Sequence, residues 1–147
     1  MVLLVPFDGS SLSKAALERA AEFSEYRGEE VVVLSVIPDS VELALERDWL
    51  DPEETFDIDK IAEKLEGQAA EIAPKARFRA EIPENVSSMA SNTTDVVRTI
   101  RTVANEEDAS IIFIGSENAG RVSTPVTSVG APVSEDPQYD VHIIRHA

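Results

Sequence analysis

Three short segments of the sequence carry residue types that could hold a small polar ligand: residues 6–10, 36–39 and 115–129. Asp8 directly follows an apolar run, where its carboxylate could contact a ligand or could turn the chain and cap a helix. Gly115 ends another apolar run, and a glycine there suits either a turn or the close approach of a ligand. Backbone N–H groups at the start of a helix after Asp8 could also attract an anion. These segments therefore favour non-covalent binding.

The sequence offers little for catalysis or metal binding. It contains no cysteine, which excludes thiol catalysis, disulfide bonds and cysteine-ligated metals. Ser10 and Ser13 have no candidate base nearby in sequence, so we expect them to cap a helix rather than to act as nucleophiles. His142 and His146 lie at the extreme C-terminus with a spacing that predicts no metal site. No Gly-x-Ser-x-Gly, GxGxxG or Walker A sequence occurs.

Apolar runs and helical periodicities predict the elements that must position these residues. Buried strands are predicted over residues 2–7, 31–37 and 110–114, a half-exposed strand near a sheet edge over 76–82, and a last strand over 141–145. Helices are predicted from Ser10 or Ser11 to Gly28, over 57–72, and from Asn92 or Thr93 onward. Residues 39–56 are expected to be irregular or partly helical, and the glycines and prolines of 116–137 disfavour a long helix there.

Strands that alternate with helices predict an α/β fold around a mostly parallel sheet. No repeat, low-complexity segment or linker interrupts the chain, so residues 1–147 are predicted to form one domain. In a doubly wound sheet, ligands bind beyond the carboxyl ends of the strands, where the strand order reverses. We therefore expect the three segments around Asp8, Val36 and Gly115 to meet in one crevice.

Four stretches in these places resemble the universal stress protein family. They are Val5-Pro6-Phe7-Asp8-Gly9-Ser10 followed by Ser13 and an alanine-rich helix, Leu34-Ser35-Val36-Ile37-Pro38, Ala109-Ser110-Ile111-Ile112-Phe113-Ile114-Gly115-Ser116, and Tyr139-Asp140-Val141-His142-Ile143-Ile144-Arg145. Together they cover nearly the whole chain in the order and spacing of the family. The resemblance implies the adenine-nucleotide α-hydrolase-like fold, a doubly wound sheet of five parallel strands with helices on both faces. It also implies a homodimer built through the last strand.

The resemblance further implies which residues would hold a ligand. Many members of the family bind ATP, and others of the same fold do not. Carried over to this sequence, Asp8 matches the acid that holds the adenosine, and Pro6 and Val36 match positions beside the adenine. Gly115 matches the first glycine of the phosphate-binding segment G-x2-G-x9-G-[ST], and Ser128 matches its final serine. ATP with Mg is thus the possible cofactor.

The phosphate-binding segment departs from the pattern of the family. Asn118 stands where the second glycine belongs, and Gly120 could serve only with a shifted loop. The final pair reads Ser128-Val129, or Thr127-Ser128 if one residue is removed; we prefer the second alignment, and neither keeps the glycine. Arg121 is the only basic residue between Arg101 and Arg145. The sequence therefore predicts a degenerate ATP-binding motif.

The charge of the chain bears on its partners and its environment. The 147 residues include 28 acidic and 13 basic ones, which gives a formal net charge of −15. Such a charge repels phosphate backbones and anionic bilayers, so we expect no nucleic-acid or membrane partner. Spread acids with only four lysines are typical of proteins from salt-in halophiles, where salt screens self-repulsion. Without a targeting signal or a spanning segment, the protein is expected to be cytoplasmic.

Three functions are consistent with these observations. The preferred hypothesis is a stress-response module that works through homodimerisation and has a degenerate ATP-binding motif. The alternative is an ATP-binding sensor in which Pro6, Asp8, Val36, Gly115 and Ser128 hold the nucleotide. An enzyme that hydrolyses the nucleotide is the third, for which no catalytic base or activating lysine can be named; we expect no enzyme, with weak hydrolysis left open.

Overall fold

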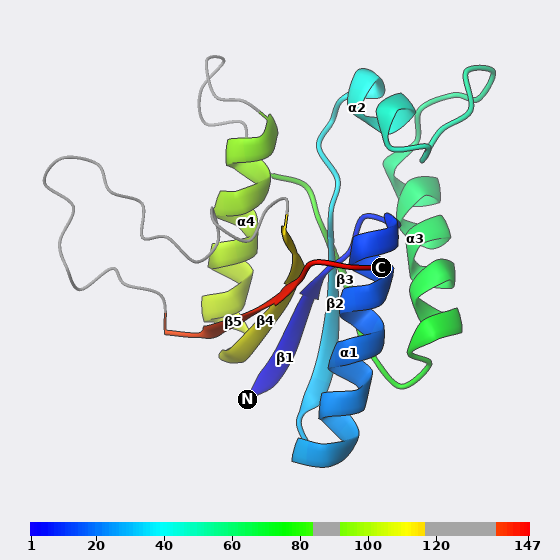
Figure 1. The fold of residues 1–147 in the computed structure, drawn as a ribbon. Helices are drawn as coiled ribbons and strands as arrows, with labels where there is room; N and C mark the ends of the chain where they lie inside the picture. Colours follow the sequence, from blue (N-terminus) through cyan, green and yellow to red (C-terminus); the bar gives the residue numbers. More distant parts are fainter. Residues whose placement is uncertain (84–91, 117–137) are drawn as a thin grey trace, which may run out of the picture.

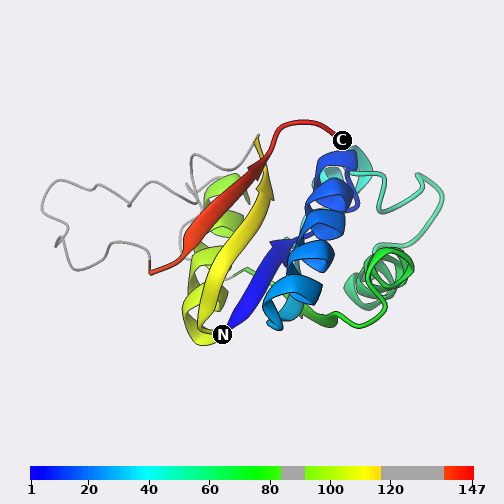
Figure 2. The ribbon, with the colours of Figure 1, turned by 60° about the horizontal axis from the view of Figure 1, so that its bottom comes forward.

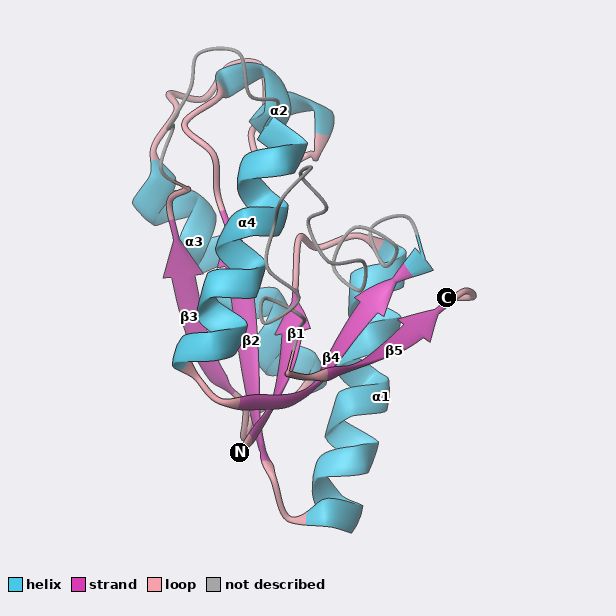
Figure 3. Ribbon diagram, turned by 90° about the vertical axis from the view of Figure 1, so that its left-hand side faces the viewer, coloured by secondary structure: helices cyan, strands magenta, loops and turns pink. Residues whose placement is uncertain are grey.

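The computed structural model describes residues 1–83, 92–116 and 138–147. Five strands form one parallel sheet in the order β3-β2-β1-β4-β5, which Figure 3 shows from its broad side. The strands are β1 (Val2–Pro6), β2 (Glu30–Val36), β3 (Arg77–Glu81), β4 (Ala109–Gly115) and β5 (Asp140–Ile144). After β1 the chain builds outward through β2 and β3, and it then returns to the other side of β1 to form β4 and β5. This order confirms the predicted α/β fold and places the reversal between β1 and β4.

Helices cover both faces of the sheet, as expected for a doubly wound fold. Helices α1 (Ser11–Arg27) and α3 (Ile58–Ile72) lie on one face, and α4 (Asn92–Glu106) lies on the other (Figures 1 and 2). The short helix α2 (Val41–Glu46) lies beyond the carboxyl end of β2 (Figure 1). The strands are buried because apolar side chains alternate between two cores. Leu3, Val5 and Phe113 pack on the α1 and α3 side, and Leu4 and Ile112 pack on the α4 side.

The sequence signals for the helices are confirmed at their ends. Ser10 is the N-cap of α1, and its Oγ accepts a hydrogen bond from the backbone N–H of Ser13 at 3.2 Å. Gly28 closes α1 in the left-handed region at a φ of 71°. Helix α3 is amphipathic as predicted and buries Ile61, Leu65 and Ala69. Capping and periodicity are local properties, which is why the sequence predicts these elements well.

An aromatic cluster joins α1 to the strands at the β5 end of the sheet. Phe113 of β4 is fully buried, and its ring lies 5.3 Å from that of Phe23 in an edge arrangement. His142 of β5 stacks on Phe113 with 5.0 Å between the ring centroids. Burial lowers the pKa of His142, and the charge of Arg19 lowers it further. The cluster therefore favours the neutral imidazole and fixes β5 against the core.

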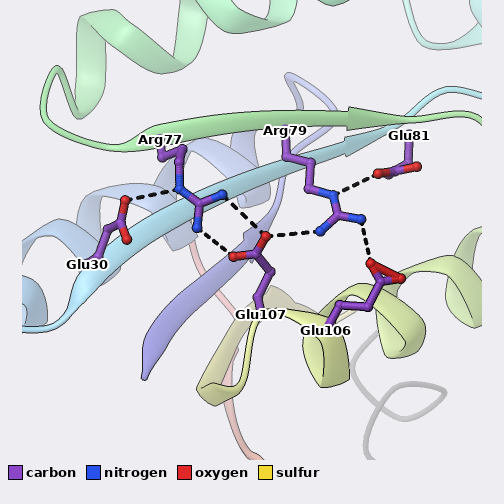
Figure 4. A network of polar contacts seen from close by, with 6 residues as sticks. All are labelled: Glu30, Arg77, Arg79, Glu81, Glu106 and Glu107. Atoms are coloured by element: carbon purple, nitrogen blue, oxygen red, sulfur yellow. Dashed lines mark hydrogen bonds and ion pairs between the residues drawn. The ribbon is translucent and has the colours of Figure 1, made fainter.

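An ion-pair network ties the other edge of the sheet to the end of α4 (Figure 4). Arg79 of β3 contacts Glu81, Glu106 and Glu107 at 2.7 to 2.9 Å, and Arg77 contacts Glu30 and Glu107. Glutamates at the carboxyl end of a helix oppose the helix dipole, so the two arginines offset an unfavourable charge there. The hydrogen bonds to Arg77 and Arg79 keep the pKa of Glu107 below its ordinary value, although burial acts against them. Arg77 and Arg79 therefore form a partly exposed strand face that pairs with nearby acids, which agrees with the half-exposed strand predicted over 76–82.

Candidate functional site

The crevice at the strand reversal is lined by residues from β1, β2, β4, α1, α2 and α4 and from the segments that follow β1, β2 and α2. It brings together four of the five predicted site residues, namely Pro6, Asp8, Val36 and Gly115. Ser128, the fifth, lies outside the described residues. Apart from Arg47, the other lining residues are apolar or small: Phe7, Ser10, Leu12, Ser13, Leu34, Pro38, Leu43, Trp49, Val96, Ile100 and Ile114. Parallel strands end at the same edge of the sheet, so residues far apart in sequence meet here.

Asp8 is the only acidic residue among the described residues that line the crevice, and both of its carboxylate oxygens are engaged. Oδ1 accepts a hydrogen bond from the backbone N–H of Ser10 at 2.9 Å, and Oδ2 accepts one from Nη1 of Arg47 at 2.6 Å. Burial raises the pKa of Asp8, but the hydrogen bonds from Ser10 and Ser13 and the charge of Arg47 outweigh it. The pKa therefore lies below its ordinary value. Asp8 is thus a fixed carboxylate at neutral pH.

Ser35 of the neighbouring strand β2 holds the backbone of Phe7, the residue that follows β1. Its buried Oγ donates a hydrogen bond of 2.7 Å to the carbonyl of Phe7, and the backbone N–H of Phe7 donates one of 2.8 Å to the carbonyl of Leu34. These bonds extend the pairing of β1 with β2 just past Pro6. The backbone that leads into Asp8 is therefore held against the neighbouring strand.

Gly115 at the end of β4 lies against Leu12 in the first turn of α1. A Cβ atom on Gly115 would lie 3.0 Å from Cβ of Leu12, which is tighter than nine in ten such contacts in proteins. The absence of a side chain therefore serves the packing of β4 against α1 in this structure. This packing is a use of the glycine that the sequence did not predict, and close approach of a ligand to Gly115, which lines the crevice, stays a prediction.

The segment after α2 contributes two side chains that the sequence did not assign to the site as contacts. Trp49 is buried, and its Nε1 donates a hydrogen bond of 2.7 Å to the backbone carbonyl of Asp8. Asp48 has a positive φ of 58°, which turns the chain so that Trp49 packs inward. Trp49 is therefore a buried hydrophobic anchor beside the end of β1. Arg47 had no sequence signal, because its partner Asp8 lies 39 residues away.

The cavity between the described residues has a volume of about 80 Å³. Pockets that enclose small ligands commonly have volumes of ~300–1,000 Å³. A ligand as large as a nucleotide would therefore extend beyond the space that these described residues enclose. In the part of the chain that the structure describes, no group of three His, Cys, Asp or Glu side chains could hold a metal ion.

Comparisons with known proteins agree with this geometry. A model described as the universal stress protein family matches residues 1–145. A structure of a universal stress protein in complex with cAMP is 20% identical and has a TM-score of 0.58, with 100% of this chain and 98% of that chain covered. The universal stress protein from Archaeoglobus fulgidus in complex with dAMP is 24% identical, with a TM-score of 0.54 and coverage of 99% and 98%. These likenesses show the fold.

No curated protein is similar enough to count as a match. Within residues 1–83, 92–116 and 138–147, no helix is long and apolar enough to cross a membrane.

Proposed function

Because the chain belongs to the universal stress protein family, we propose that it is a regulatory module that binds an adenine nucleotide in the crevice between the ends of β1 and β4. The observation that carries the proposal is the meeting of Pro6, Asp8, Val36 and Gly115 at the strand reversal. The complexes of two structural neighbours with cAMP and dAMP support adenine nucleotides as the ligand class. This proposal is the sensor hypothesis of the sequence analysis. It still has to account for the phosphate-binding segment, which departs from the glycine pattern of the family.

The crevice offers the hydrogen-bond acceptors and the apolar side chains that an adenine nucleotide needs. The carboxylate of Asp8 offers acceptor lone pairs to the N–H or O–H groups of an adenosine, and Val36 and Ile100 offer apolar walls to a base. Ser128 stays a prediction for the phosphate end. Mg²⁺, if it accompanies ATP, would be held mainly by the phosphates, because the described residues offer no cluster of acidic ligands. We propose no catalysis, since the described lining of the crevice holds no lysine and no histidine.

Calorimetric titration tests this function. We expect AMP, cAMP or ATP with Mg²⁺ to bind at millimolar concentration or below, and guanine nucleotides at the same concentrations to bind more weakly. The titrations are run at low and at molar KCl, because the net charge of −15 repels a triphosphate until salt screens it. If no adenine compound binds at either salt concentration, the proposed function is wrong. Analysis of the products after long incubation with ATP tests for hydrolysis.

The second candidate is a module that works through homodimerisation with or without nucleotide. Strand β5 lies at the edge of the sheet and pairs with β4 on one side only. Ile143 on this strand is 37% exposed. An edge strand with exposed apolar side chains and unpaired backbone groups tends to pair with another chain. We therefore propose that β5 forms the interface of a homodimer in the cytoplasm. The acidic surface and few lysines support a halophilic source of this module.

Light scattering in molar KCl tests the dimer. We expect a mass of about twice the 16.0 kDa of the chain for the natural protein and a monomer for Ile143→Lys, because a buried lysine at the interface is costly. Leu45→Lys is the matched control, since Leu45 is also 37% exposed but belongs to α2, which follows β2, and β1 and β4 separate β2 from β5 in the sheet. A monomer for the natural protein, or the same mass for Ile143→Lys as for the natural protein, contradicts this interface.

A further inference from the structure

Arg47 is the only cationic side chain among the described residues that line the crevice. It is the residue that directly follows α2, and its backbone N–H donates a hydrogen bond of 3.0 Å to the carbonyl of Leu43. Its guanidinium reaches across to Asp8, which holds one of its nitrogen atoms, Nη1, at 2.6 Å. The side chain is still 40% exposed, so it borders both the crevice and solvent.

The backbone around Arg47 is anchored on two sides. The indole of Trp49 is bound to the carbonyl of Asp8 at the end of β1. On the other side, Nζ of Lys64 in α3 donates a hydrogen bond of 3.2 Å to the carbonyl of Asp48. Anchors at the next two residues reduce the freedom of the Arg47 backbone, and Asp8 orients its side chain. Little entropy would therefore be lost when this guanidinium meets a ligand.

The guanidinium has donors left to offer. Nη1 binds Asp8, while Nε and Nη2 have no hydrogen-bond partner within the described residues. A guanidinium presents five N–H groups in a planar fork, which suits bidentate contact with a phosphate. Arg47 can therefore hold Asp8 and a second anion at the same time. No other described residue of the crevice has a positive charge with which to do so.

The overall charge makes the guanidinium of Arg47 important for the binding of an anion. A chain with a net charge of −15 repels anions, and two of the three glycines that the family uses around phosphates are replaced or displaced in this sequence. We propose that Arg47 recognises a phosphate of the ligand and makes the crevice select adenine nucleotides over adenosine. This inference rests on the proposed function, and it assigns the specificity for the anion to a residue on the segment after α2.

The test compares the affinities of adenosine, AMP and ATP for the natural protein and for Arg47→Gln by calorimetry. We expect AMP and ATP to bind more tightly than adenosine to the natural protein. In Arg47→Gln the affinity for both nucleotides should fall at least tenfold, while that for adenosine changes less than about twofold. Arg47→Lys keeps the positive charge but loses the planar donor geometry of the guanidinium. We therefore expect part of the preference for nucleotides that is lost in Arg47→Gln to be present in Arg47→Lys.

Arg19→Gln is the matched control, because it removes the same charge from an exposed site on α1. We expect it to leave the ratio of nucleotide to adenosine affinity within about twofold of the natural protein. The inference is overturned if Arg47→Gln leaves this ratio unchanged, if it weakens adenosine as much as the nucleotides, or if Arg19→Gln lowers the ratio equally. Absence of binding by all three compounds to the natural protein contradicts the proposed function instead. Retained adenosine binding shows that the variants are folded.

Discussion

Truncation of Phe113 to alanine is expected to lower the free energy of unfolding by about 3–5 kcal/mol. Phe113 is fully buried in β4, one strand from the centre of the sheet, and its ring contacts those of Phe23 and His142. Removal of the ring loses its transfer free energy and leaves a cavity that the sheet cannot close, because pairing fixes β4 between β1 and β5. The loss of the stacked partner also loosens His142 on β5.

Chemical denaturation at several salt concentrations measures this effect. Phe78→Ala is the matched control, because Phe78 lies on the edge strand β3 and is only partly buried. Its truncation should therefore lower the free energy of unfolding clearly less than that of Phe113. If the two truncations prove equal in cost, the central role that we assign to Phe113 is wrong. A double variant with Phe23→Ala should cost less than the sum of the single variants, since the two rings are in contact.

Replacement of Asp8 by asparagine is expected to weaken adenine-nucleotide binding at least tenfold and to destabilise the fold by about 1–2 kcal/mol at neutral pH. Asparagine preserves the shape of the side chain but removes the charge that holds Arg47 at 2.6 Å. It also replaces one acceptor oxygen with a donor. Calorimetry measures the first effect and chemical denaturation the second. Asp39→Asn is the matched control, because this acid lies near the carboxyl end of β2 but does not line the crevice.

The stability effect of Asp8→Asn should depend on pH in a defined direction. The pKa of Asp8 is lowered in the folded protein, so the folded state binds fewer protons at this site than the unfolded state does. The contribution of Asp8 is therefore fully present above the unfolded pKa of about 3.9 and is lost as the pH falls through the lower folded pKa. The difference between the natural protein and the variant should shrink in that acidic range. A difference that grows with acidification, or unchanged nucleotide affinity at neutral pH, contradicts the role given to Asp8.

The sequence by itself determined the elements and the fold. Continuous apolar runs such as Val31–Leu34 predict strands that are covered on both faces, and the structure buries all four of these residues. Ser10 and Gly28 mark the ends of α1 through interactions within a few residues. The crevice followed from the same reasoning, because parallel topology forces Asp8, Val36 and Gly115 to one edge of the sheet. Local chemistry and sheet geometry are sufficient for these features.

The tertiary structure alone decided which charges and surfaces meet. Arg47 faces Asp8 only because α2 ends at the carboxyl edge of the sheet and Asp48 turns the chain inward. Likewise, Arg79 finds Glu106 and Glu107 because α4 ends beside the distant strand β3. A charged side chain on the surface carries no periodic signal that names its partner, whereas burial of apolar surface imposes one on strands and helices. The pattern of the sequence therefore predicts where the crevice lies. Only the packed chain shows that the cationic side chain of Arg47 lines this crevice beside Asp8.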